Sequence, residues 1–104
     1  IQHPLAECWT ALESAWLMGL KPAWLYDHGR PCGAEANAGK LLGGRAGHNA
    51  CLQAELTHCG MGYGKEYMVE RPLREVMICR IAPVSEQMVL SFIAERVLGR
   101  PCSY

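Results

Sequence analysis

Apolar side chains recur every three or four residues through the first quarter of the chain, and this spacing predicts one long α-helix. One face of that helix would carry Leu5, Trp9, Leu12, Trp16, Leu20 and Ala23. The remaining faces are also mostly apolar, and a helix of this kind is buried on more than one side. A chain of 104 residues with few helices cannot enclose it. We therefore expect this helix to contact protein outside the chain, either further domains or another subunit.

Prolines and a glycine set the expected limits of this first helix. Pro4 lies where the helix could begin, and Glu7 in the first turn would favour the positive end of the helix dipole. Pro22 removes one backbone donor inside the pattern, so we expect a kink there. Gly29 and Pro31 should then close the helix.

A second long helix is predicted from about residue 34 to about residue 58. Gly39, Gly43 and Gly47 recur every four residues in it, and Gly44 adds a further glycine. Each interior glycine costs roughly 1 kcal/mol of helix stability relative to alanine. We expect the row to form a groove for the close approach of a neighbouring helix; the alternative is drift at positions that tolerate glycine.

The pattern ends in a corner marked by Gly60, Gly62 and Gly64, at alternate positions. Glycine can adopt the left-handed conformation that ends a helix, and it lets another backbone or a ligand come close. A glycine-rich helix end that binds no ligand explains the same spacing. The corner matches neither a dinucleotide-binding GxGxxG after a strand nor a phosphate-binding P-loop.

Two more helices should follow the corner. The first is short, over residues 69–80; the second opens with Ser85 as N-cap and Glu86 in its first turn, and Gly99 and Pro101 end it. Strand signals are absent. The sequence therefore predicts an all-α helical bundle of two long antiparallel helices, a short helix and a closing helix.

Charge and composition argue against several classes of protein. Lys and Arg number 10 and are balanced by 10 Asp and Glu, so no broad basic field attracts nucleic acid or acidic lipid. The apolar runs span a few residues and are too short to cross a bilayer. No secretory leader is recognisable. We expect a cytoplasmic protein with a packed core.

The 6 cysteines include no CxxC pair, and we expect reduced thiols that mostly pack as small apolar groups. His48, Cys51, His58 and Cys59 can be aligned as a metal site on paper. On one helix these positions span about three turns, which is too far for a single ion. No metal site is expected.

Residues 57–63 (Thr-His-Cys-Gly-Met-Gly-Tyr) and 66–71 (Glu-Tyr-Met-Val-Glu-Arg) resemble the C-terminal helical domain of flavin-dependent acyl-CoA dehydrogenases. In that family a His-Gly-Gly-Met-Gly-Tyr corner precedes a Glu-Tyr-x-Val-Glu-Arg helix. Residues 73–75 and the opening at 2–7 resemble it as well. The resemblance covers nearly all of residues 1–104. It implies a C-terminal domain that lacks its own first helix, the N-terminal helical domain and the middle β domain.

The resemblance also implies a reaction and its partners. A carboxylate takes the α-proton of an acyl-CoA thioester, the β-hydrogen leaves as hydride to FAD, and an electron-transfer flavoprotein accepts the electrons. The base is often a glutamate in a Glu-Gly-Thr turn, whose first position falls on Pro83 here. Because proline cannot accept a proton, we expect the base upstream of Ile1; Glu86 is the alternative within this chain.

Contacts to FAD follow from the same resemblance. Ser85 falls where the turn's threonine hydroxyl meets the flavin, and Gln87 lies close by, with a solvated helix residue as the equal alternative. The backbone at Cys59 and Gly60 would approach the adenine end of FAD in a neighbouring subunit. Leu56, in place of a glutamine, and Cys59, in place of a glycine, depart from the family pattern.

The expected function is therefore that of one part of an acyl-CoA dehydrogenase. We expect the isolated chain to be inactive, to lack FAD and to self-associate through its first two helices. The alternative is a free-standing helical oligomer that descends from such an enzyme and works as a binding or scaffold module.

Overall fold

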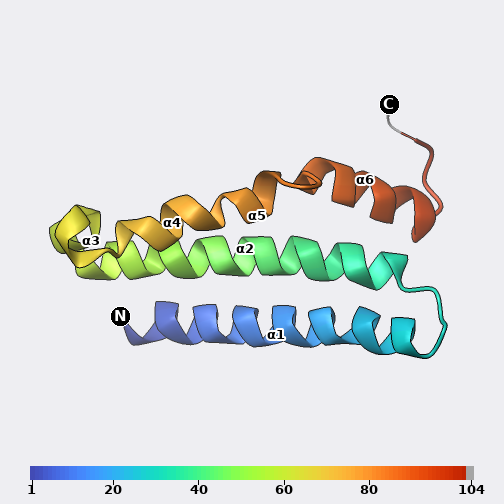
Figure 1. The fold of residues 1–104 in the computed structure, drawn as a ribbon, viewed down its shortest axis with the longest axis horizontal. Helices are drawn as coiled ribbons and strands as arrows, with labels where there is room; N and C mark the ends of the chain where they lie inside the picture. Colours follow the sequence, from blue (N-terminus) through green and yellow to red (C-terminus); the bar gives the residue numbers. More distant parts are fainter. Residues whose placement is uncertain (103–104) are drawn as a thin grey trace.

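The structure, a computed structural model, describes residues 1–102. These residues form helices and no strand, which confirms the expected all-α fold with two long packed helices (Figure 1). In order they are α1 Gln2–Asp27, α2 Gly33–His58, α3 Gly60–Tyr63, the 3-10 helix η1 Lys65–Tyr67, α4 Glu70–Val76, α5 Ile78–Ile81 and α6 Glu86–Arg96.

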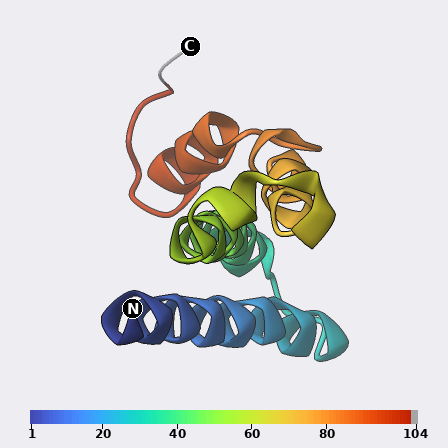
Figure 2. The same ribbon diagram turned by 90° about the vertical axis from the view of Figure 1, so that its left-hand side faces the viewer.

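The helices form three layers with α2 in the middle. α1 lies antiparallel along one side of α2, and α4, α5 and α6 return along the other side (Figures 1 and 2). α2 contacts every other α-helix of the described chain, whereas α1 packs chiefly against α2. One long side of α1 is therefore left without cover by the other described residues.

The face of α1 that packs on α2 is the one with the smaller side chains. Its least exposed residues alternate at spacings of four and three: Pro4, Cys8, Ala11, Ala15, Met18, Pro22 and Leu25. This spacing is the seam expected for two helices at a small crossing angle. The larger face stays exposed, and Trp9 and Trp16 each keep 65% of their surface accessible.

The ends of the long helices differ slightly from the expected ones. α1 begins at Gln2, ahead of Pro4, so Glu7 lies in the second turn and not in the first as predicted. The helix continues through Pro22 to Asp27. α2 begins at Gly33 and ends at His58, close to the predicted limits.

The glycines of α2 face two neighbours and do not line one groove. A Cβ on Gly39 would lie 3.2 Å from the Met18 carbonyl oxygen in α1. On Gly44 and Gly47 it would meet the α5 and α4 side, and on Gly43 nothing within 4 Å. Each residue turns the helix by about 100°, so the row drifts from one neighbour toward the other. The predicted single groove is wrong, but close helix approach is present on both sides.

At the corner, the positive φ angles fall on residues other than its glycines. Cys59 ends α2 with φ 52°, and Met68 follows η1 with φ 58°. Gly60, Gly62 and Gly64 are absent from the left-handed region, so that part of the prediction is wrong. Close backbone approach is present, because a Cβ on Gly62 would lie 2.5 Å from the Glu55 carbonyl oxygen.

The helices after the corner form where they were predicted, except that the first of them is split in two. The helix expected over residues 69–80 is split at Met77 into α4 and α5. Ser85 caps α6 as predicted, since its Oγ accepts a hydrogen bond of 3.4 Å from the Met88 amide. Val89, in the second turn of α6, is the most buried large side chain, with 1% of its surface exposed.

One described stretch, Glu70–Arg96, is long and apolar enough to cross a membrane by length and composition alone, which the short apolar runs of the sequence did not predict. In the structure this stretch is divided among α4, α5 and α6. The backbone is extended at Ala82 and again at Ser85, between the last two helices. It is therefore not one continuous helix here.

The prediction that most cysteines are packed is wrong. Cys8 is buried in the α1–α2 seam, but Cys59 and Cys79 are exposed. Cys51 lies between these extremes, and partial burial raises the pKa of its thiol. Packing in the core therefore accounts for only some of the cysteines.

Gly43 and Gly44 should respond in opposite directions when a methyl group is added. Gly43→Ala should raise the free energy of unfolding by up to about 1 kcal/mol, because alanine favours the helix and space is open. Gly44→Ala should lower it, because the new Cβ would lie 3.0 Å from the Cys79 carbonyl oxygen and overpacking costs roughly 1–3 kcal/mol. Urea unfolding measures both, and shifts of equal sign and size would contradict the packing described.

Candidate functional site

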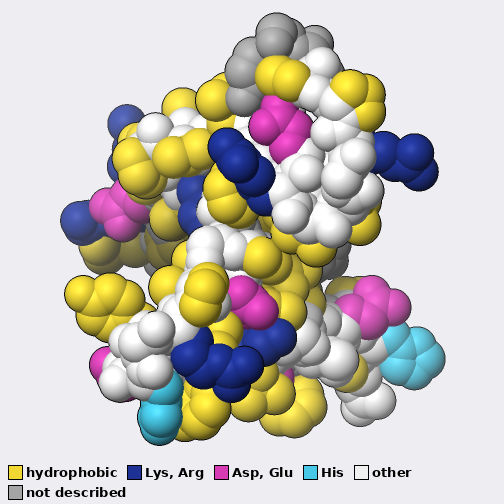
Figure 3. Space-filling view, turned by 90° about the vertical axis from the view of Figure 1, so that its right-hand side faces the viewer, with side chains coloured by type: hydrophobic (Ala, Val, Ile, Leu, Met, Phe, Trp, Pro, Cys, Tyr) yellow, Lys and Arg dark blue, Asp and Glu magenta, His cyan; other side chains and the backbone are white. Residues whose placement is uncertain are grey.

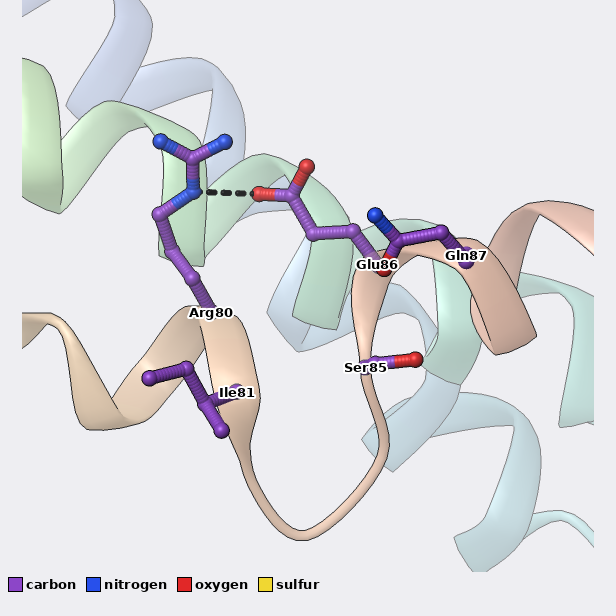
Figure 4. Close-up of a pocket in the computed structure, with 5 residues that line it drawn as sticks. All are labelled: Arg80, Ile81, Ser85, Glu86 and Gln87. Carbon is purple, nitrogen blue, oxygen red and sulfur yellow. Dashed lines mark hydrogen bonds and ion pairs between the residues drawn. The ribbon is translucent and has the colours of Figure 1, made fainter.

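The turn between α5 and α6 brings together two of the residues predicted to contact FAD. A pocket of about 320 Å³ is lined there by Arg80, Ile81, Ser85, Glu86 and Gln87 (Figure 4). The α6 helix supplies the amide of Gln87, and its N-cap supplies the hydroxyl of Ser85. The pocket thus presents neutral hydrogen-bonding groups beside a charged cluster.

Glu86 is the centre of that cluster. Its Oε1 lies 2.7 Å from Nε of Arg80 and its Oε2 lies 3.3 Å from Nε of Arg45, which reaches across from α2. The residue is only 9% exposed. The hydrogen bond from Arg80, and then that from Arg45, lower the pKa of the Glu86 carboxyl below its usual value against the opposing effect of burial.

These ion pairs determine whether Glu86 can act as a general base. A carboxylate that two guanidinium groups hold in its ionised form is a poor proton acceptor, because protonation would break both charge-assisted hydrogen bonds. The geometry thus argues against Glu86 as the base. Pro83, at the position of the family's glutamate, lies exposed in the turn and borders a second pocket of about 190 Å³. No carboxylate lines that second pocket.

Ser85 is held in place and still keeps hydrogen-bonding capacity. Its hydroxyl accepts from the Met88 amide, which leaves the O–H free to donate to a ligand. Figure 4 shows the hydroxyl pointing away from the Arg80–Glu86 pair. Lys40 of α2 donates a hydrogen bond to the carbonyl of Val84, the residue before Ser85. The turn is thus fastened to α2 on its inner side.

The other two predicted residues lie at the far end of the molecule. Cys59 and Gly60 lie where α2 meets α3 at one end of the molecule, whereas α6, whose N-cap is Ser85, begins above the middle part of α2 (Figure 1). The longest dimension of the chain is 46 Å. A Cβ on Gly60 would meet nothing within 4 Å, and Cys59 is exposed, so this corner is open. The chain therefore carries two separate candidate surfaces.

Other candidate sites receive no support within the described chain. Over residues 1–102, no group of three or more His, Cys, Asp or Glu side chains is placed to hold a metal ion. His58 instead hydrogen-bonds within α2, its Nδ1 lying 2.7 Å from the Ala54 carbonyl oxygen. On the face drawn in Figure 3, positive and negative side chains are interspersed among hydrophobic ones.

Arg45 and Arg80 were not predicted as members of the site. No local spacing connects Arg45 with Glu86, since 41 positions separate them along the chain. Arg80 lies closer, yet its position in a short amphipathic segment looks like an ordinary exposed helix residue. Only the packing of α5 and α6 against α2 brings the three together.

The lowered pKa of Glu86 gives a pH dependence with a defined sign. Because this pKa lies below the unfolded value of about 4.3, the ionised carboxylate stabilises the fold above that pH. The contribution is lost as pH falls through the folded pKa. Glu86→Gln should therefore destabilise the chain near neutral pH and lose this effect in acid. Urea unfolding across pH checks it, and an equal loss in acid would contradict the ion pairing.

Comparison with known proteins gives consistent matches. The family described as Acyl-CoA dehydrogenase, C-terminal domain, matches residues 1–98. Acyl-CoA dehydrogenase FadE12 of Mycobacterium tuberculosis (strain ATCC 25618 / H37Rv) is 43% identical over 106 residues, covering 100% of this chain and 27% of that protein. The probable acyl-CoA dehydrogenase YngJ of Bacillus subtilis (strain 168) is 40% identical over 98 residues, 94% of this chain and 26% of that protein.

A relative named for a different substrate gives the same result. Benzylmalonyl-CoA dehydrogenase of Aromatoleum aromaticum is 34% identical over 97 residues, 93% of this chain and 26% of that protein. The chain thus spans about a quarter of the length of these curated relatives, 26% to 27%. With an all-α fold and a match across residues 1–98, the chain belongs to the acyl-CoA dehydrogenase family and is homologous to its C-terminal domain.

Proposed function

We propose that this chain serves as the C-terminal helical part of a flavin-dependent acyl-CoA dehydrogenase, which removes two hydrogens from an acyl-CoA thioester. The observation that carries the proposal is the family match over residues 1–98 by a chain that spans only 27% of its relative FadE12. In this proposal, the thioester substrate and the electron-transfer flavoprotein belong to the complete protein. This chain supplies subunit contacts and part of the FAD site.

The residues of the α5–α6 turn fit the role proposed for them. Ser85 retains an O–H donor, and the exposed amide of Gln87 can both donate and accept hydrogen bonds. Both would hold FAD by hydrogen bonds, and the bound flavin would supply the hydride acceptor. The open backbone at Cys59 and Gly60 would approach FAD held by a neighbouring copy.

The proton acceptor must come from elsewhere in the complete protein. Pro83 has no ionisable group, and the carboxylate of Glu86 is engaged by Arg45 and Arg80. A general base has to be free to take the proton within hydrogen-bond reach of it. We therefore place the base outside this chain, on an earlier helix, and infer that residues 1–104 alone do not oxidise a thioester.

The subunit contacts are proposed for the outer side of α1. Leu5 is 50% exposed, Leu12 42%, Leu20 47%, and Trp9 and Trp16 65% each, all on one helix face. Monomeric soluble proteins rarely leave so continuous an apolar strip in water. Its burial against a second chain would remove this surface from solvent, which is the dominant favourable contribution to association.

The proposal is tested on the purified chain of residues 1–104. We expect no visible flavin absorbance, no oxidation of acyl-CoA thioesters with an artificial electron acceptor, and elution larger than a monomer. Bound FAD or turnover would contradict the proposed division of roles. A reading frame that starts just before Ile1 would instead favour a free-standing binding or scaffold module, whereas a long in-frame stretch upstream would favour the enzyme.

Replacing an exposed tryptophan of α1 should weaken self-association. Trp16→Gln removes an indole that is 65% exposed in the centre of the apolar strip, so sedimentation velocity should show a shift toward monomer. Leu98→Gln is the matched control, because it removes an apolar side chain that is 66% exposed beyond the end of α6, away from both proposed subunit contacts. Equal effects of the two changes would place the contact elsewhere.

A further inference from the structure

The ion pairs of Glu86 join three helices that are distant in the sequence. The carboxylate opens α6, Arg45 lies midway along α2, and Arg80 belongs to α5. Among residues 1–102 no other charged residue is buried as a whole, although one carboxylate oxygen of Glu95 is also shielded from solvent. Each carboxylate oxygen has its own guanidinium partner, so the buried charge is satisfied from two directions.

The same stretch of α2 holds the turn at further points. Lys40 donates a hydrogen bond to the carbonyl of Val84. One helical turn later, the absent side chain of Gly44 lets the Cys79 carbonyl of α5 come close. Arg45, the next residue, pairs with Glu86 after the extended part of the turn. The 6 residues from Lys40 to Arg45 of α2 thus contact the turn ahead of its extended part, within it and after it.

We propose that Glu86 is a positioning residue, which fixes the turn between α5 and α6 so that Ser85 and Gln87 keep a constant orientation. The inference rests on the proposed function, in which these two residues contact FAD. Glu86 lies between them in the chain and directs its carboxylate toward Arg80 (Figure 4). Movement of Glu86 would therefore move the first turn of α6 and both candidate contacts.

The ion pairs of Glu86 fix the direction of the first turn of α6 more strictly than apolar packing would. An apolar contact is non-directional and would tolerate rotation of the helix end. Charge-assisted hydrogen bonds from two separate guanidinium groups restrict both the distance and the angle of the carboxylate. A glutamine at position 86 would keep the size of the side chain and lose the charge on which both bonds depend.

Amide hydrogen exchange in the complete protein, with and without FAD, tests the inference. In Glu86→Gln the amides of Met88 and Val89, which bond to the Oγ and the carbonyl of Ser85, should exchange about tenfold faster. Amides of α1 and the first half of α2 should be unchanged. Flavin fluorescence should show faster loss of FAD from the variant, since the turn that carries Ser85 and Gln87 is no longer fixed.

Two further variants keep the test decisive. Arg45→Gln removes the longer of the two contacts, 3.3 Å, and should give the same local change in smaller degree. Glu75→Gln is the matched control: it breaks the 2.7 Å pair with Arg71 on the surface of α4 and should change neither exchange at α6 nor FAD retention.

The outcomes separate this inference from the function on which it rests. Unchanged exchange at Met88 and Val89 would overturn it, and so would a uniform increase that extends through α1, because that reports general loss of stability. Faster exchange at Met88 and Val89 with unchanged FAD retention would also overturn the proposed role of Glu86 in the FAD site. If the unaltered protein never binds FAD, the proposed function fails, while exchange in the flavin-free protein still decides whether Glu86 fixes the turn.

Discussion

Close contact on two sides of α2 is the constraint from which the rest of the fold follows. Gly39 admits the backbone of α1 on one side, and Gly44 and Gly47 admit the α4–α5 side on the other. A helix with so many interior glycines loses roughly 1 kcal/mol at each of them. Its helical form therefore depends on neighbours close enough to replace that loss with packing. The three layers of the chain are the result.

That arrangement has opposite effects at the two outer layers. On one side, α5 and α6 come near enough for Arg45 to reach the carboxylate of Glu86, so a defined polar turn is built against α2. On the other side, α1 uses its small side chains for the seam, and the large ones, Trp9 and Trp16 among them, face outward. The α5–α6 turn, which carries the candidate FAD contacts, is thus held by contacts within the chain. The outer face of α1 remains apolar and exposed.

Much of this could be predicted from the sequence, and the failures have physical causes. Helical periodicity and the Ser85 cap predicted where the helices lie. The resemblance of residues 57–63 to the corner motif of acyl-CoA dehydrogenases indicated the family. The face of α1 that packs on α2 could not be predicted, because most of the helix surface is apolar and the packed face depends on how closely α2 can approach. The positive φ fell on Cys59 rather than on a glycine, since α2 ends at His58 and its C-cap is the residue before Gly60. The roles of Gln87 and Gly60 toward FAD stay predictions.

The seam between α1 and α2 has one more consequence. Across the described residues, side-chain polar contact between these helices consists of the Lys21–Glu35 pair at 3.3 Å and a weak contact of 3.7 Å from Asn49 to the Cys8 sulfur. The rest of the seam is apolar, and apolar contact is non-directional and roughly proportional to the area removed from water. The attachment of α1 to α2, the most extensive helix contact among the described residues, therefore comes from buried apolar area, and salt or pH should change its strength little.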